Sequence, residues 1–239
     1  MFKLALYGDS LANPRHGIVK SNERYLSIIE NYIRNNGIND FIEIRDNAKG
    51  GATLYELYEK YKEDNTYFEI PGNILIIHAG IVDCAPRPIS DDTRLRISKM
   101  PSLLKKVIIK YIHNNRASLI EKNNGYVKTS LRLFKEQLLE FINDGKDNYE
   151  KIFIINICPT NVTIEQRSPG FTNNIDKYNK VINEAISEIG SNKLRLINLN
   201  QYINQNICNI DDYVVKEDGH HIHSLTHRWI AKEIIKQIN

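Results

Sequence analysis

Short apolar runs alternate along this chain with longer segments in which apolar residues recur every three or four positions. The short runs predict β-strands, and the three- and four-residue spacing predicts amphipathic helices. The predicted strands are Lys3–Tyr7, Phe41–Arg45, Asn73–His78, Lys151–Ile157 and Leu194–Leu199. The predicted helices are Asn22–Asn35, Thr53–Glu63, Tyr126–Ile142, Asn173–Ile189 and Ser224–Ile238. This alternation predicts an α/β fold with a five-stranded parallel sheet between two layers of helices.

Two of the predicted strands are apolar throughout, at residues 74–77 and 152–155. Strands of this kind are covered by helices on both faces, so we expect these two in the interior of the sheet. Ser21 and Thr53 have the spacing of helix N-caps, and Gly37 and Gly190 stand where helices would end.

Residues 84–125, after the third predicted strand, contain no further strand and are too long for an ordinary loop. We therefore predict a helical insertion there. Within it, residues 103–112 form a basic amphipathic helix. We expect this helix to cap the edge of the sheet with its lysines in solvent; the alternative is a lid, or a contact with an anionic substrate or a membrane surface.

Length and composition suit a single domain over residues 1–239. The chain is 41% hydrophobic and 26% charged, and its net charge of +3 is too small to indicate nucleic acid binding. No stretch approaches the roughly 18 apolar residues of a membrane helix, and the N-terminus lacks the features of a signal peptide. We therefore expect a cytoplasmic protein without stable membrane insertion; the oligomeric state stays open.

Cysteine and histidine spacing argues against a metal or disulfide framework. Cys84, Cys158 and Cys208 show no C-x-x-C pairing, so we expect buried free thiols. The histidines of residues 217–227 fit no H-E-x-x-H or comparable zinc motif. No metal and no cofactor are predicted.

Ligands of open parallel sheets bind at the carboxyl ends of the strands, so the residues there are the candidates for chemistry. Ser10 follows the first strand after Gly8, which permits a tight turn, and is a candidate nucleophile. Asp218 and His221 precede the last helix, and their three-residue spacing lets the carboxylate orient the imidazole as a base for Ser10. The polar stretch 161–171, after the fourth strand, is a place where substrate could bind.

These motifs together resemble the SGNH (GDSL) hydrolase superfamily over nearly the whole chain. Gly8-Asp9-Ser10-Leu11 resembles its first block, Gly51 the glycine of its second, and Asp218-Gly219-His220-His221 its fifth. The resemblance implies a flavodoxin-like three-layer fold and a Ser10–His221–Asp218 triad. It also implies that the backbone N–H groups of Ser10 and Gly51 form an oxyanion hole, and that His227 is structural.

The third block departs from the family pattern. Where the family has G-x-N-D, this chain has Gly80-Ile81-Val82-Asp83, so the asparagine that donates the third oxyanion hydrogen bond is replaced by Val82. Arg87 or His78 could replace that donor; Arg87 could instead bind a carboxylate or phosphate, or pair with Asp83. The segment 80–88 resembles a subset of the superfamily associated with bacterial surface-polysaccharide biosynthesis.

The resemblance implies a serine esterase that removes a short acyl group, such as acetyl, from a carbohydrate or glycan precursor. A sugar hydroxyl in place of water would make the same site an O-acyltransferase. Two further readings stay open: a non-catalytic binder of glycan or sugar nucleotide, and a flavodoxin-like cofactor or signalling domain. Fold alone does not separate these classes, because function depends on the site.

Overall fold

The structure, a computed structural model, describes residues 1–37, 41–67, 72–206 and 209–238. Its centre is a five-stranded parallel sheet in the order β2-β1-β3-β4-β5. The strands are β1 (Phe2–Gly8), β2 (Ile42–Ala48), β3 (Gly72–His78), β4 (Tyr149–Ile155) and β5 (Leu194–Ile197). The predicted α/β fold is confirmed, and the two apolar strands, β3 and β4, are both interior.

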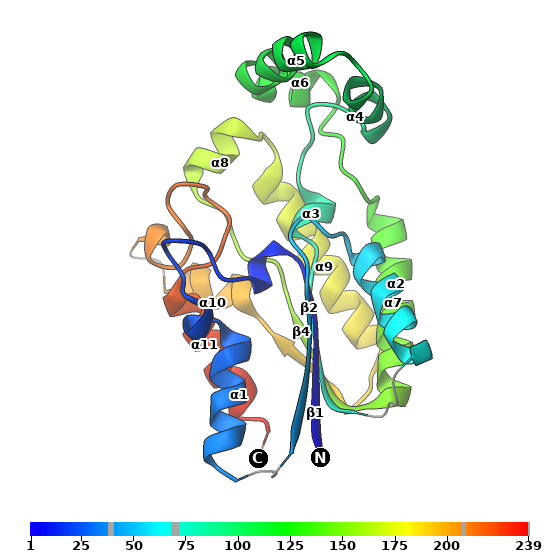
Figure 1. The fold of residues 1–239 in the computed structure, drawn as a ribbon, viewed down its shortest axis with the longest axis vertical. Coiled ribbons are helices and arrows are strands. Elements are labelled where there is room, and N and C mark those ends of the chain that lie inside the picture. The colour runs from blue at the N-terminus through cyan, green and yellow to red at the C-terminus, as the bar shows by residue number, and fades with distance from the viewer. Residues whose placement is uncertain (38–40, 68–71, 207–208, 239) are drawn as a thin grey trace.

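Helices cover both faces of the sheet (Figure 1). On one face α1 (Tyr25–Asn35) packs against α11 (Ser224–Ile235). On the other, α7 (Leu131–Asn148) packs between α2 (Leu54–Tyr67) and α9 (Phe171–Ile189). These five helices are the predicted ones, and they give the three layers that the sequence pattern indicated.

The core lies between the sheet and its helices. Leu6, Tyr7, Leu75, Ile76 and Phe153 are buried on the central strands. Burying one large apolar side chain stabilises the fold by about 1.5–3 kcal/mol, so these strands contribute strongly to the stability of the sheet.

Three of the four predicted helix ends are confirmed, those at Thr53, Gly37 and Gly190. The Thr53 N–H donates to the Glu56 carboxylate at 2.8 Å, and the Glu56 N–H donates to Thr53 Oγ1 at 3.3 Å. Gly190 ends α9 with a left-handed φ of +59°. Ser21 was wrong as the cap of α1, because residues 21–23 form a 3-10 turn, η2 (Ser21–Glu23), and Arg24 precedes the helix. Gly37 directly follows Asn36, the C-cap of α1, and its left-handed φ of +61° ends the helix as predicted.

The last strand is shorter than predicted. Asn198 ends it, because its side chain accepts a hydrogen bond from the Gln201 N–H and caps a new helix, α10 (Leu199–Gln205). Of the cysteines, Cys84 and Cys158 are free and buried, as expected. Cys208 lies outside the described residues.

The predicted insertion is present as a group of short helices beyond the carboxyl edge of the sheet (Figure 1). They are α4 (Asp91–Ser98), α5 (Ser102–Asn114) and α6 (Arg116–Lys122), and they follow α3 (Ile81–Cys84), which begins soon after β3. The basic helix α5 buries none of its residues and packs on α4 and α6. The expectation that it caps a sheet edge was therefore wrong, because α4 and α6 hold it away from the edge strands. No helix in the described part of the chain is long and apolar enough to cross a membrane.

Candidate active site

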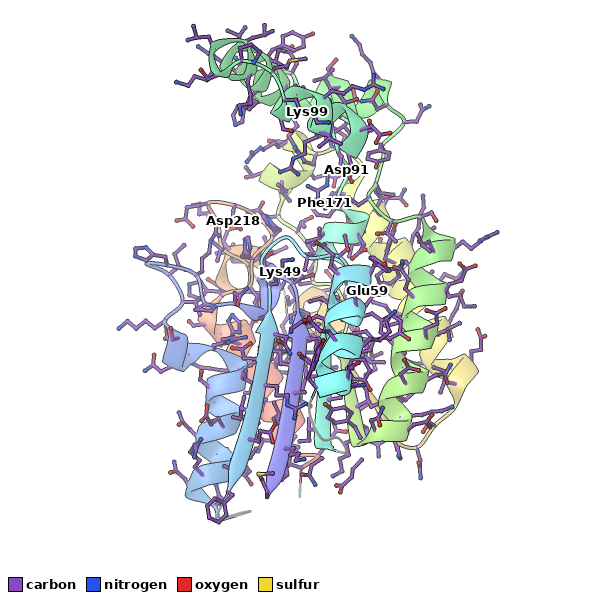
Figure 2. All side chains as sticks on the ribbon, turned by 45° about the vertical axis from the view of Figure 1, so that its right-hand side comes forward. Lys49, Glu59, Asp91, Lys99, Phe171 and Asp218 are labelled. Carbon is purple, nitrogen blue, oxygen red and sulfur yellow. The ribbon has the colours of Figure 1, made fainter. Side chains whose placement is uncertain are left out.

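The carboxyl ends of the strands carry residues from distant parts of the sequence. In Figure 2, Lys49 follows β2, Phe171 begins α9, and Asp218 belongs to the loop before α11; all three lie around this edge of the sheet. Asp91 and Lys99 lie farther out, on the insertion. Figure 2 thus places the Asp218 loop at the end of the sheet where the first strand delivers Ser10.

Ser10 opens a short 3-10 turn, η1 (Ser10–Ala12), directly after β1. The turn is tight because a Cβ on Gly8 would lie 2.5 Å from the Cβ of Ala12, so only glycine fits there. Asp9 fixes the turn by accepting a hydrogen bond from the Leu11 N–H at 2.9 Å. The Ser10 hydroxyl makes no hydrogen bond with any described residue, so it is available for a substrate.

Asp218 and His221 are hydrogen-bonded as their spacing predicted. The distance from His221 Nδ1 to Asp218 Oδ2 is 3.0 Å, and the His221 N–H donates to Asp218 Oδ1, also at 3.0 Å. The Arg15 guanidinium lies 2.8 Å from Asp218 Oδ2. Burial opposes ionisation, but the His221 hydrogen bonds outweigh it and lower the pKa of Asp218 well below its usual range. An ionised carboxylate therefore orients the imidazole.

The loop that carries this pair is held by glycine and asparagine. Gly219 has a left-handed φ of +74°, and a Cβ there would lie 2.2 Å from Asn161 Oδ1. The Asn161 N–H donates to the Gly219 carbonyl at 3.0 Å. Asn161 also caps α8 (Val162–Arg167), so the stretch after β4 positions the Asp218 loop.

A cavity of about 290 Å³ opens beside Ser10. It lies between the carboxyl ends of β1 and β2, the insertion, α8 and the start of α9. Its described lining residues are Ser10, Gly51, Ile81, Val82, Ala85, Arg87, Arg116, Ile164, Arg167, Ser168, Phe171 and His220. The polar stretch after β4 thus contributes to the cavity, as the sequence indicated.

Two backbone N–H groups on the wall of this cavity have no acceptor. Neither the Ser10 N–H nor the Gly51 N–H donates a hydrogen bond within the described residues. Gly51 has a φ of +78°, and a Cβ there would meet nothing within 4 Å, so the backbone conformation alone favours glycine. Free N–H groups beside a nucleophile are what an oxyanion hole requires.

Val82 occupies the wall where the resemblance would place an asparagine. It lies in α3, lines the cavity and is buried. Arg87 lies next to it, because Arg87 Nη2 donates to the Val82 carbonyl at 3.1 Å. The cavity therefore has an apolar group at this position and a guanidinium close by.

The other suggested supports of the site, His78 and Asp83, are occupied elsewhere. His78 is fully buried at the end of β3, where its Nδ1 lies 3.3 Å from the Tyr25 hydroxyl, and it is not among the lining residues. Asp83 accepts hydrogen bonds from Thr129 Oγ1 at 2.6 Å and from the Leu54 N–H at 3.0 Å. Both Asp83 oxygens are therefore used in joining α3 to its neighbours, and the structure forms no Arg87–Asp83 ion pair.

His220 is part of the candidate site, although its position in the sequence predicted no role for it there. It lines the cavity, and its ring centroid lies 4.2 Å from that of His221. Its Nδ1 lies 2.9 Å from the Asp218 carbonyl oxygen, and burial lowers its pKa. Two adjacent histidines in one loop were the available signal, but their spacing did not show that His220 lines the cavity.

Asp218, His220 and His221 also place three possible ligand atoms within 4.8 Å of one another. Arg15 lies against the same carboxylate, and its fixed positive charge would repel a cation there. The Asp218 oxygens already accept hydrogen bonds from His221. This arrangement favours an Asp–His pair over a metal site.

Asp9 should give the protein a distinctive pH dependence of stability. Burial raises the pKa of Asp9 to about 7, because its effect outweighs that of the Leu11 N–H hydrogen bond, which lowers the pKa. The unfolded carboxyl titrates near pH 4, so between about pH 4 and pH 7 the folded state binds more protons, and stability falls as the pH rises. The free energy of unfolding of Asp9→Asn, measured by urea unfolding, should therefore rise relative to that of wild type by up to about 4 kcal/mol between pH 4 and pH 7.

The exposed Asp92→Asn is the matched control for this measurement. Any packing change in Asp9→Asn is independent of pH. The prediction is therefore tested by the slope of the free energy of unfolding against pH, and not by its absolute value. Parallel pH profiles for wild type and Asp9→Asn would show that Asp9 titrates normally.

Comparisons with known proteins support the fold. No protein-family model matches the sequence, and no curated protein matches it. A lipase/acylhydrolase from Enterococcus faecalis matches with a TM-score of 0.68 and 15% identity, over 100% of this chain and 95% of its own. An acetylxylan esterase from Geobacillus stearothermophilus matches with a TM-score of 0.62 and 15% identity, over 100% and 94% of the two chains. An alpha/beta hydrolase enzyme from the metagenome of Lake Arreo, Spain, matches with a TM-score of 0.64 and 12% identity, over 99% of this chain and 94% of its own. The chain therefore has the three-layer α/β/α fold of these hydrolases over its full length.

Proposed function

We propose that the protein is a serine esterase of the SGNH type that removes a short acyl group, such as acetyl, from a carbohydrate. The observation that carries this proposal is the Asp218–His221 pair in the loop beside the cavity that holds Ser10 and Gly51. A base with its orienting carboxylate, a free hydroxyl and free N–H donors are the parts that acyl transfer needs.

In this mechanism His221 Nε2 accepts the proton of the Ser10 hydroxyl while Oγ attacks the ester carbonyl carbon. The N–H groups of Ser10 and Gly51 stabilise the negative charge on the carbonyl oxygen. As the C–O bond to the alcohol breaks, His221 returns the proton to the leaving oxygen, and an acyl-serine remains. Water, deprotonated by His221, then attacks the acyl-serine and restores the Ser10 hydroxyl.

The proposed substrate class rests on two supports. Solved structures with this fold include acetylxylan esterases. The segment 80–88 also resembles proteins of surface-polysaccharide biosynthesis, which would place the enzyme in the cytoplasm, acting on a glycan precursor. A sugar hydroxyl that replaced water in the second step would give O-acyl transfer from the same acyl-serine.

A second candidate function is non-catalytic binding of a glycan or sugar nucleotide. Val82 favours it, because the cavity lacks a side-chain donor where the resemblance implies one. Removing one oxyanion donor typically slows a hydrolase by about 10²–10³-fold. Slow turnover and no turnover are therefore the two outcomes to separate.

Labelling with a fluorophosphonate probe, followed by peptide mapping, tests the proposed function. We expect one equivalent of label, on Ser10, and none in Ser10→Ala. Acetate release from O-acetylated xylose should be lost in the same variant. A folded wild-type protein that neither reacts with the probe nor releases acetate would support the binding function instead.

A further inference from the structure

Three arginines from separate parts of the chain line the cavity beside Ser10. Arg87 follows α3, Arg116 begins α6, and Arg167 ends α8. They lie far apart in the sequence and meet only because the insertion folds over the carboxyl edge of the sheet. Arg116 is therefore a contribution of the insertion to the candidate active site.

None of these three arginines pairs with a carboxylate in the part of the chain that the structure describes, and no acidic residue is among the described lining residues. Arg87 and Arg116 are partly buried, and Arg167 is exposed. By contrast, the largely buried Arg24 and Arg45 each form an ion pair, with Asp46 and Glu43 respectively. Burying a guanidinium without a counter-ion costs free energy. The carboxylates of Asp91 and Asp83 act on Arg87 electrostatically but form no ion pair with it, so the lining of the cavity keeps a net positive charge.

Two of the three guanidinium groups, those of Arg116 and Arg87, are held in place by neutral oxygens. Arg116 Nε donates to Ser168 Oγ at 2.9 Å, and Arg116 Nη2 donates to the Pro86 carbonyl at 3.0 Å. Arg87 Nη2 donates to the Val82 carbonyl at 3.1 Å, and Arg87 Nε is buried with no partner among the described residues. Both side chains are anchored, and each keeps N–H groups that an anion could use.

The charges repel one another, which raises the cost of this arrangement. Burial lowers the pKa of Arg116, and the charges of Arg167 and Arg87 lower it further. Burial likewise lowers the pKa of Arg87. A bound anion would remove this penalty, and the guanidinium fork matches a carboxylate or a phosphate with two parallel hydrogen bonds.

We propose that Arg87, Arg116 and Arg167 form a binding site for an oxyanion, phosphate or carboxylate, carried by the ester that Ser10 attacks. The link to an ester rests on the proposed function, whereas anion binding does not. A second cavity, of about 360 Å³, shares Arg87 and Arg116; its other charged lining residues are Arg94, Lys105 and one acidic residue, Asp91. This second cavity, lined by α4 and α5, has room for the rest of a large acidic substrate.

Calorimetric titration of the Ser10→Ala protein with inorganic phosphate and with succinate, at constant ionic strength, tests the anion site without catalysis. Binding of phosphate alone, or of succinate alone, identifies the source of the oxyanion. In an added Arg167→Gln variant the Kd should rise roughly 10- to 100-fold, because one charged hydrogen-bonding group is lost. Arg167 is exposed, so this change does not disturb the core.

Arg132→Gln is the matched control, because Arg132 is 90% exposed and lies on α7, outside the cavity. Its Kd should equal that of the Ser10→Ala parent. Absence of binding for both anions, or equal Kd values in the Arg167→Gln and Arg132→Gln proteins, would overturn the proposal.

Kinetics of the wild-type protein separate this proposal from the proposed function. We expect at least about tenfold higher kcat/KM for an O-acetylated glucuronic acid or glucose phosphate than for O-acetylated glucose, and loss of that preference in Arg167→Gln. Hydrolysis of all three esters at equal rates would retain the esterase and overturn the anion site. Arginine-dependent anion binding without any hydrolysis would retain the anion site and reject the esterase.

Discussion

Replacing His221 with alanine should lower kcat/KM for 4-nitrophenyl acetate by at least about 10⁴-fold, whereas His220→Ala should stay within about tenfold of wild type. Losses of the larger size follow the removal of a member of a Ser-His-Asp triad. The comparison discriminates between two adjacent imidazoles. Of the two, only His220 is among the described lining residues of the cavity, so position alone would not identify His221 as the base.

The hydrogen bonds with Asp218 favour His221 over His220 as the base. His221 Nδ1 lies 3.0 Å from a carboxylate oxygen of Asp218, so that residue can hold the ring in the required tautomer and stabilise its charged form. His220 Nδ1 lies 3.6 Å from that carboxylate and 2.9 Å from a neutral backbone oxygen. A ring turned toward a carbonyl gains less stabilisation when it takes up a proton.

Ser10→Ala sets the background rate for this comparison, and urea unfolding of each variant confirms that it folds. Equal and large losses in His220→Ala and His221→Ala would mean that the loop acts as a unit. A large loss in His220→Ala alone would make His220 the base and reject the assignment of His221.

Most of the fold could be predicted because its signals are local. The apolar runs of β3 and β4 and the spacing of the five long helices record burial directly in the sequence. The errors fall where one side chain changes the backbone. Asn198 caps α10 and so ends β5 early, and Lys20 with Glu23 forms the turn that displaced the cap expected at Ser21.

The Asp218–His221 hydrogen bond could be predicted because both groups lie in one turn. The convergence of Arg87, Arg116 and Arg167 could not, because it depends on how the insertion packs over the sheet. His78 shows the opposite error. It ends a strand at the correct edge, but its side chain points to Tyr25 in the core, and a strand end alone does not fix that direction.

Val82 and Arg87 lie side by side where the resemblance implies an oxyanion donor. Arg87 lies against the Val82 carbonyl, and α3 leads directly into the segment that carries Arg87. If Arg87 binds the anion of the substrate, it is not free to serve as the third oxyanion donor. The site would then be one that gains substrate binding at the cost of stabilisation of the transition state.

Val82→Asn should therefore raise kcat for 4-nitrophenyl acetate by about 10²-fold with little change in KM. An asparagine in α3 places an N–H₂ donor on the cavity wall that holds Ser10 and Gly51, and one oxyanion donor is worth about 10²–10³-fold in rate. A donor that acts only on the developing charge changes kcat rather than KM.

Val82→Ala is the control, because it removes the same apolar group without adding a donor; its kcat should not rise. A folded Val82→Asn protein with unchanged kcat would show that another group already fills the donor position. The double variant Val82→Asn/Arg87→Gln identifies that group: if Arg87 is the existing donor, the asparagine restores the rate that Arg87→Gln loses. If Arg87 holds only the substrate anion, Arg87→Gln should leave the kcat of this neutral ester unchanged, and the gain from asparagine should persist in the double variant.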